Sequence, residues 1–541
     1  MRLSVPLRMA VVGVTLATLL QPALLLTVPL THARRFKTKK TTEEKTQSYW
    51  KTVAQNELNY AIRMTHNNNV ARNVIIFLGD GMSIPTITAG RIYKGQQASR
   101  SGEEGQLFFE QFPHVGLSKT YNVDKQVPDS ASTATAYLSG VKTNYYTVGV
   151  DASATYQDCN SITEENKVYS IVKWAQDAEK RTGVVTSTRV THATPSATYA
   201  HVTDRDWECD GNIPEECKEV VKDIARQLVE DEPGASINVV MGGGYQYMVA
   251  NATGTDNDPI DEDWGCLRED GRNLVQDWID KKTQAGLRHK FVRTKSELNQ
   301  VSGSDVDYLL GIYSNGHVPY EHEKREKNLD IPTLAEMTKK AIEILREGEN
   351  GYFLLVEGGR IDHAHHDTMA HRALDELVAM DEAVLQAASM TNEADTLILV
   401  TADHSHTMSF SGYPARGQEI VGLAGYDDDG YAYTTLMYAN GPGYNATRIN
   451  ITEEDTREWE YTQLATVPRD SETHGGDDVS IYARGPMAHL FHGLHEQNYI
   501  PHVMAYSACI GDYEHDCRSA AERAVPAVTL IVFAVIMRIL S

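Results

Sequence analysis

Four apolar runs of this chain lead into residues that can bind metal ions or phosphate. The runs and the residues after them are 74–79 before Asp80, 352–356 before Glu357, 397–402 before Asp403 and His404, and 184–188 before His192 and Thr194. Gathering three carboxylates at one place is unfavourable unless cations neutralise their charge. These residues therefore predict a hydrolytic site that holds several metal ions.

A histidine-rich segment follows Glu357. Asp362 and His366 lie four residues apart, so they share one face if the segment is helical. A carboxylate with an imidazole is a typical pair of zinc ligands, and Asp403 with His404 offers a second pair. A lone histidine in a glycine-rich turn is usually structural, but His474 could supply the third protein ligand that a zinc site of this kind needs.

Ser130 begins a run of small residues with good helix propensity that stops at Gly140. Glycine is a common residue just beyond a helix C-terminus, so we expect a helix with Ser130 at its N-terminus. Free N–H groups and the helix dipole favour an anion there. Ser130 alone would be interpreted as a helix N-cap, but next to a metal site we expect a nucleophile.

Arg205 lies between two acidic residues, Asp204 and Asp206. A guanidinium can donate to two phosphate oxygens at once, and the two carboxylates could hold it in place. The alternative is a salt-bridge triplet on the surface.

The elements that position these residues follow from the same runs. Apolar runs of this length, separated by helical patterns, are typical of strands buried on both faces. The alternation continues to about residue 407 and predicts an α/β fold, with a mostly parallel central sheet flanked by helices. Because ligands bind at the carboxyl ends of such strands, we expect these residues to meet at one sheet edge.

Two segments depart from this alternation. Residues 409–473 are dominated by Gly, Tyr, Asp and Pro, which predicts a surface insertion of loops and β-structure. Residues 42–64 predict a polar, amphipathic helix outside the core, which packs on its own domain or on a neighbouring subunit.

The whole chain has 541 residues, 41% of them hydrophobic, which allows a large core. Its formal net charge of −24 argues against a nucleic-acid-binding protein, because phosphate backbones require surfaces rich in Lys and Arg.

Both ends of the chain have the pattern of processed segments. Residues 1–33 resemble a secretory signal peptide, with Arg2 and Arg8 before an apolar stretch. Residues 519–541 combine small residues with an apolar tail, as a GPI-anchor signal does, and Ser519 is the expected attachment site. A bare hydrophobic tail is the alternative. We therefore expect the protein on the extracellular face of the cell membrane.

The remaining features fit a secreted chain. An even number of cysteines predicts three disulfides among Cys159, Cys209, Cys217, Cys266, Cys509 and Cys517. Three N-glycosylation motifs occur, at Asn251, Asn445 and Asn450.

Several motifs, in order from about Trp50 to Cys517, resemble those of animal alkaline phosphatases. They are Asp80-Gly81-Met82, Pro128-Asp129-Ser130, the 357–366 segment, the 401–406 segment and the 472–476 segment. The resemblance implies a catalytic domain over residues 34–518, with residues 409–473 as a crown-like insertion. It also implies a homodimer, in which Tyr413 reaches the site of the partner subunit.

The resemblance implies two zinc ions and one magnesium ion. Its ligand sets are Asp362, His366 and His474 for the first zinc, Asp80, Asp403 and His404 for the second zinc, and Asp80, Thr194 and Glu357 for magnesium. His192 would lie near the magnesium ion, and His406 would lie next to the metal ligands without binding a metal ion itself. Arg205 would bind the phosphate.

The resemblance also implies disulfides Cys159–Cys217 and Cys509–Cys517, which leaves Cys209 with Cys266. The mammalian members carry an additional calcium site. Ser314 stands where that site has a glutamate, which weakens the expectation of calcium, although Asp330 is retained.

The activity implied is hydrolysis of phosphate monoesters through a phosphoserine on Ser130. One alternative is a metal-dependent phosphodiesterase of the same superfamily. A membrane-anchored glycoprotein that uses this scaffold to bind a partner is another.

Overall fold

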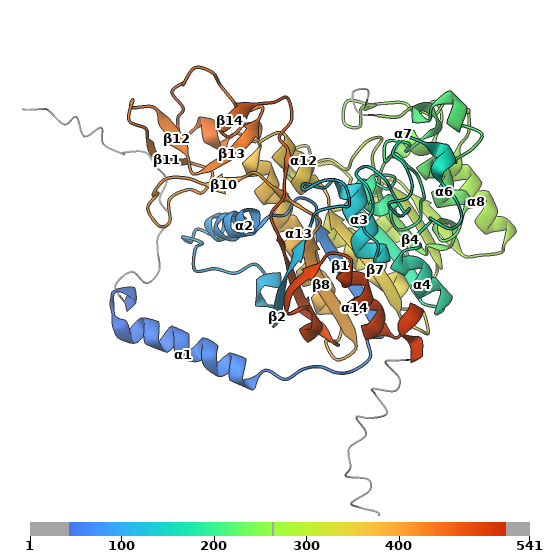
Figure 1. Cartoon of the computed structure of the whole chain (residues 1–541), viewed down its shortest axis with the longest axis horizontal. Coiled ribbons are helices and arrows are strands. Elements are labelled where there is room, and N and C mark those ends of the chain that lie inside the picture. The colour runs from blue at the N-terminus through green and yellow to red at the C-terminus, as the bar shows by residue number, and fades with distance from the viewer. Residues whose placement is uncertain (1–42, 262–264, 516–541) are drawn as a thin grey trace, which may run out of the picture.

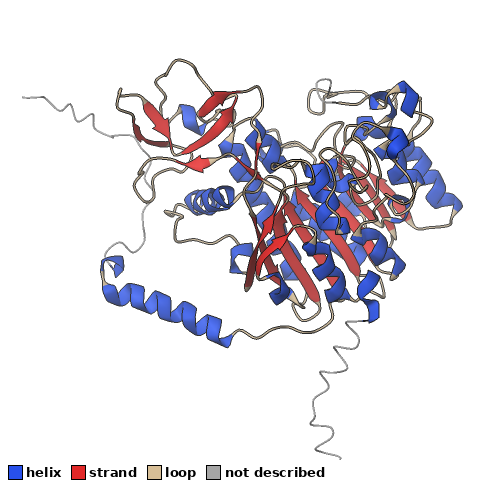
Figure 2. Ribbon diagram, viewed as in Figure 1, coloured by secondary structure: helices blue, strands red, loops and turns tan. Residues whose placement is uncertain are grey.

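The computed structural model describes residues 43–261 and 265–515, which build a large central sheet with helices on both faces (Figures 1 and 2). Across the sheet the strands are β17 (Gly493–Glu496), β2 (His114–Lys119), β16 (Val479–Arg484), β8 (Thr396–Ala402), β1 (Asn73–Gly79), β7 (Tyr352–Gly358), β3 (Arg181–Arg189), β4 (Val239–Gly243), β6 (Tyr308–Ile312) and β5 (His289–Val292). Only β16 runs antiparallel to its neighbours in this sheet. The predicted fold class is confirmed.

The central strands are buried on both faces, as their apolar runs predict. In β1, Val74, Ile76 and Leu78 pack into one hydrophobic cluster, whereas Ile75 and Phe77 pack into another on the opposite face. This arrangement follows from the two-residue alternation of side chains along a strand. The helices that cover the two faces therefore complete two separate cores.

The described part of the chain contains fourteen α-helices. They are α1 (Gln47–Arg63), α2 (Ile84–Gln97), α3 (Ser130–Ser139), α4 (Ile171–Asp177), α5 (Ala193–Ser196), α6 (Ile224–Glu230), α7 (Tyr245–Met248), α8 (Leu274–Gln284), α9 (Lys295–Gln300), α10 (Glu321–Glu326), α11 (Leu334–Leu345), α12 (Arg360–His366), α13 (Ala370–Met390) and α14 (Tyr499–Ala508). None of the helices in this part is long and apolar enough to cross a membrane.

The segment after β8 leaves the main sheet. It begins with β9 (Ser405–His406) and ends with β15 (His474–Gly475), and these two short strands pair with each other. Between them, a small sheet is formed by β10 (Ser409–Phe410), β13 (Leu436–Gly441) and β14 (Ala465–Pro468). A further pair is β11 (Leu423–Tyr426) with β12 (Ala432–Thr434). Figure 1 shows these strands together in orange, above one end of the main sheet. The expected β-structure and loops are confirmed.

Helix α1 lies apart from the rest of the chain in Figure 1, and none of its residues is buried. The predicted helix outside the core is therefore present, and no other described part of the chain buries any of its residues.

Candidate active site

The three carboxylates predicted to meet at one sheet edge do so. Leu78 in β1 is paired with Glu357 in β7 and with Thr401 in β8, so the three strands end level with one another. Asp80 and Asp403 follow two of these ends, and Asp80, Glu357 and Asp403 are all fully buried.

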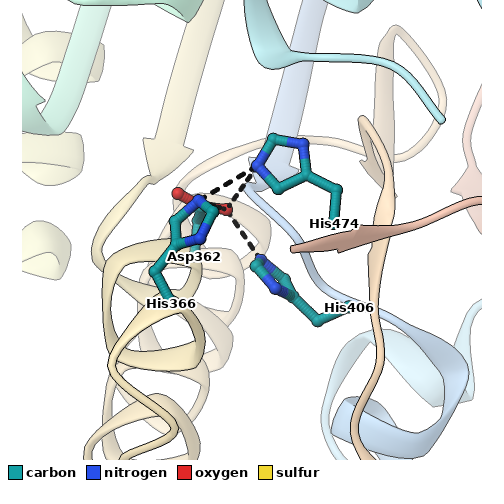
Figure 3. A group of neighbouring side chains, drawn as sticks. All are labelled: Asp362, His366, His406 and His474. Atoms are coloured by element: carbon teal, nitrogen blue, oxygen red, sulfur yellow. Dashed lines mark hydrogen bonds and ion pairs between the residues drawn. The ribbon is translucent and has the colours of Figure 1, made fainter. Parts of the chain in front are cut away.

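The first candidate metal group consists of Asp362, His366, His406 and His474, whose ligand atoms lie within 4.8 Å of one another (Figure 3). Helix α12 places Asp362 and His366 on one face, with His366 Nε2 3.4 Å from Asp362 Oδ1. His474 Nε2 is 3.4 Å from the same oxygen and 3.1 Å from His366 Nε2. The predicted helix and the shared face are therefore observed.

Backbone carbonyls orient two of these imidazoles. His366 Nδ1 lies 2.5 Å from Glu472 O, and His474 Nδ1 lies 2.8 Å from Pro128 O. A histidine that donates one ring N–H to a carbonyl is left with a lone pair on the other nitrogen, as metal-binding histidines require. Both remaining nitrogens face Asp362.

His406 has a different environment. Its Nε2 is 2.7 Å from Asp362 Oδ1, and its Nδ1 contacts Glu472 Oε2. Burial alone would lower the pKa of His406, but the carboxylates of Glu472 and Asp362 outweigh it and raise the pKa to about 10. His406 is therefore better suited to hold Asp362 in place than to donate a lone pair. Glu472 was not singled out in the sequence, although it lies two residues before His474.

The second candidate group consists of Asp80, Asp403 and His404. His404 Nε2 is 3.2 Å from Asp403 Oδ2 and 3.4 Å from Asp80 Oδ1. Burial raises the pKa of Asp80 well above its ordinary value, and the charges of Asp403 and Asp362 raise it further. A cation here would relieve this repulsion.

Ser130 contacts this second group directly. Its Oγ is 3.1 Å from His404 Nε2 and 3.4 Å from Asp80 Oδ1. Asp129, and not Ser130, is the N-cap of α3, because the Asp129 carboxylate accepts from the backbone N–H groups of Ala131 and Ser132. The interpretation of Ser130 as an ordinary capping residue is therefore wrong, and its hydroxyl remains available for chemistry.

The third candidate group consists of Asp80, His192 and Glu357. Glu357 Oε2 accepts from Thr188 Oγ1 at 3.1 Å and also contacts Thr186 Oγ1. Burial raises the pKa of Glu357 to about 7, against the opposing effect of hydrogen bonds from Thr186 and Thr194. Carboxylate and hydroxyl oxygens are typical magnesium ligands. Thr186 and Thr188 were not expected from the sequence as partners of Glu357.

Two buried oxygens test whether metal ions fit here. Asp80 Oδ2 and Glu357 Oε1 have no hydrogen-bond partner among the described residues. A buried carboxylate oxygen without a partner is unfavourable unless a cation binds it. The donor sets and these two oxygens therefore fit bound metal ions.

Arg205 is held by a different carboxylate from the ones expected. Its Nη1 donates to Asp129 Oδ2 at 3.2 Å, and its Nη2 lies 3.1 Å from His192 Nε2. Asp204 instead accepts from Gln157 Nε2 at 2.9 Å, so the expectation that Asp204 holds Arg205 is wrong. Asp206 forms no ion pair with Arg205 within 4.0 Å among the described residues, although its charge raises the pKa of Arg205. Asp129 thus caps α3 and orients Arg205 at the same time.

A fourth group of possible ligands, His192, His317 and His363, is less suited to a cation. Arg360 Nη1 donates to His363 Nδ1 at 2.9 Å, and the backbone N–H of Arg189 donates to His317 Nδ1 at 3.3 Å. Arginine groups thus occupy lone pairs that a metal ion would need, and their charge repels it.

The other predicted residues lie away from this site. The structure contains disulfides Cys159–Cys217 and Cys209–Cys266. Asn251, Asn445 and Asn450 are exposed. Cys517 and Ser519 lie outside the described residues.

Known proteins of one family are similar to this chain over most of its length. A family model described as alkaline phosphatase matches residues 71–510. The chain is 51% identical over 476 residues to an alkaline phosphatase of Gadus morhua, covering 87% of this chain and 98% of that protein. It is 49% identical to the tissue-nonspecific isozyme of Homo sapiens, with coverage of 88% and 92%.

Solved structures share the fold. Thermus thermophilus alkaline phosphatase superimposes with a TM-score of 0.57 at 23% identity, covering 82% of this chain and 92% of that chain. The alkaline phosphatase of the Antarctic bacterium TAB5 gives a TM-score of 0.56 at 21% identity, with coverage of 82% and 100%.

Proposed function

The chain belongs to the alkaline phosphatase family and is a phosphoric monoester hydrolase with metal cofactors, and we propose that it acts through a phosphoserine at Ser130. The observation that carries the proposal is the position of Ser130. Its hydroxyl is buried, lies at the first turn of α3, and contacts Asp80 and His404 of one candidate metal group. A metal ion held by Asp80 and His404 would lie beside this hydroxyl, and coordination to a metal ion activates a serine nucleophile.

We propose two zinc ions and one magnesium ion, held by the sets that the family resemblance implies. They are Asp362, His366 and His474, then Asp80, Asp403 and His404, and for magnesium Asp80, Thr194 and Glu357. The metal ions would supply positive charge that stabilises the attacking and leaving oxygens and makes hydroxide available near neutral pH.

The side chains then have distinct tasks. Ser130 Oγ attacks phosphorus and displaces the alcohol, which leaves with a proton, and water later cleaves the phosphoserine to release phosphate and restore the hydroxyl. Arg205 donates to two phosphate oxygens, where negative charge spreads in the transition state. Asp129 keeps the guanidinium aimed at them.

Replacement of Ser130 tests this proposal. Ser130→Ala should abolish hydrolysis of an aryl phosphate, whereas Ser139→Ala, at the far end of the same helix, should keep it. Among the described residues, Ser139 Oγ donates to the Thr135 carbonyl and contacts none of the candidate metal ligands, so it is a matched control. Normal turnover by Ser130→Ala would exclude the phosphoserine.

We further propose residues 34–518 as the catalytic domain, with residues 409–473 as its crown-like insertion, in a homodimer. Trp50, Leu58 and Ile62 of α1 are 54%, 59% and 71% exposed, and Tyr413 is fully exposed, so a partner subunit has apolar side chains to cover. Burial of such side chains favours association.

The proposed processing follows the sequence alone. Residues 1–33 would be a signal peptide, and Ser519 would carry a GPI anchor after removal of the tail, on the extracellular face of the cell membrane. Asn251, Asn445 and Asn450 would carry glycans.

We propose no calcium site, since Ser314 Oγ donates to Gly316 O and Asp330 Oδ1 accepts from Ser296.

A further inference from the structure

Beside Arg205 lies a cluster of hydrogen-bond donors that the proposed reaction does not use. His192, whose Nε2 is 3.1 Å from Arg205, has ring-centre distances of 5.2 Å to His317 and 5.4 Å to His363. The rings of His317 and His363 are 4.2 Å apart, and both residues are half-buried. We call His317, His363, Arg189 and Arg360 the donor cluster.

The arginines determine which ring nitrogens carry protons. An uncharged imidazole has one N–H and one lone pair. Because Arg360 Nη1 donates to His363 Nδ1, the proton of His363 is on Nε2, and that atom has no hydrogen-bond partner among the described residues. The cluster thus presents an N–H group and not a lone pair.

His317 leads to the same conclusion. One of its nitrogens faces the backbone N–H of Arg189 at 3.3 Å, and the other contacts Arg189 Nη1. A neutral ring can accept from only one of them, so one donor stays without an acceptor. Donors therefore outnumber acceptors at this ring as well.

Charge also favours an anion. Glu208 and Asp261 pair with Arg189, the latter at 3.9 Å, and Asp129 pairs with Arg205, but Arg360 forms no ion pair within 4.0 Å in the described part of the chain. Arg360 Nε is buried without a hydrogen-bond partner, and the guanidinium stacks 3.9 Å from the Tyr320 ring. Burial raises the pKa of Asp367 and the nearby charge of Arg360 opposes this, but the two form no direct ion pair, so the guanidinium keeps N–H groups for carboxylate or phosphate oxygens of a ligand.

We propose that the donor cluster binds a second anionic group of the substrate while Arg205 holds the phosphate that is cleaved. This rests on the proposed function and deepens it, because it names a preferred class: phosphate monoesters that also carry a carboxylate or a second phosphate. His192 links the two places, since its Nε2 lies 3.1 Å from Arg205 Nη2 and its ring also lies next to the rings of His317 and His363.

The test compares two ligands of similar size that differ in one charge, 3-phosphoglycerate and glycerol 3-phosphate. Their binding is measured by calorimetry on the metal-loaded full chain carrying Ser130→Ala, so that no turnover is needed. We expect 3-phosphoglycerate to bind about tenfold more tightly, as one charge-assisted hydrogen bond at a partly exposed site provides. Adding His317→Asn or Arg360→Gln should remove this preference.

His492→Asn, on an exposed histidine outside the cluster, is the matched control and should leave the preference intact. Equal affinity for the two ligands, or a preference that survives in either folded cluster variant, would overturn the proposal. A cooperative thermal unfolding transition would establish that each variant is folded. One folded cluster variant is enough to decide the test. Hydrolysis of glycerol 3-phosphate by the unmodified enzyme tests the proposed function separately, so the two failures are distinguishable.

Discussion

Glu376 should make the folded protein less stable as the pH rises. It lies on α13, which packs against the ligand-bearing helix α12, and it is 5% exposed. Burial and the neighbouring charge of Glu321 raise the pKa of Glu376 from 4.5 to about 8, although Lys324 opposes this. The folded state therefore keeps a proton that the unfolded state has lost.

This difference in bound protons sets the direction and the size of the change in the free energy of unfolding with pH. Between pH 4.5 and pH 8 the folded state binds more protons, so stability falls as the pH rises through that window and levels off above it. Each pKa unit corresponds to about 1.4 kcal/mol, so the free energy of unfolding falls by on the order of 4–5 kcal/mol across this window. The loss is smaller if water reaches the ionised carboxylate.

Glu376→Gln removes the titrating group and keeps an oxygen for the Glu321 backbone N–H, which donates to Glu376 Oε1 at 2.6 Å. We expect the variant to match the parent near pH 5 and to unfold at a higher temperature near pH 9. Scanning calorimetry from pH 5 to pH 9 measures the difference, with the exposed Glu349→Gln as the control. A difference that does not change with pH would refute the reasoning.

Three further predictions concern the site. Arg205→Lys should lower kcat/KM for an aryl phosphate about 100-fold, because lysine cannot donate to two oxygens in a fixed fork; a change below threefold in steady-state assays would contradict this. Glu472→Gln should destabilise the protein by about 3 kcal/mol in denaturant unfolding, since it leaves protonated His406 with one carboxylate fewer; unchanged stability would mean that His406 is uncharged. Thr188→Val should weaken magnesium activation about tenfold in metal titrations, because Glu357 loses a hydrogen bond that orients it; an unaltered titration would remove Thr188 from the site.

The sequence predicted those parts of the site that depend on local pattern. Buried strands are visible as apolar runs, and parallel strands bring their carboxyl ends to one edge, so Asp80, Glu357 and Asp403 could be placed together. The spacing of Asp362 and His366 predicted one helical face.

The partners of these residues could not be predicted in the same way. Asp129 lies 76 residues from Arg205, and Glu472 lies 66 residues from His406. Such pairs depend on how the loops fold back onto the edge of the sheet, and a short sequence motif does not predict that. Asp204 and Asp206 were preferred for Arg205 because they are adjacent in sequence, yet adjacent side chains need not face each other.

Trapping the phosphorylated enzyme tests the central claim most directly. The metal-loaded protein would be mixed with excess aryl phosphate, quenched in acid within its first turnovers, digested and analysed by mass spectrometry. The proposed mechanism predicts phosphate on the peptide that contains Ser130, and none in Ser130→Ala. Turnover without any phosphorylated peptide, or with phosphate on a different residue, would contradict it.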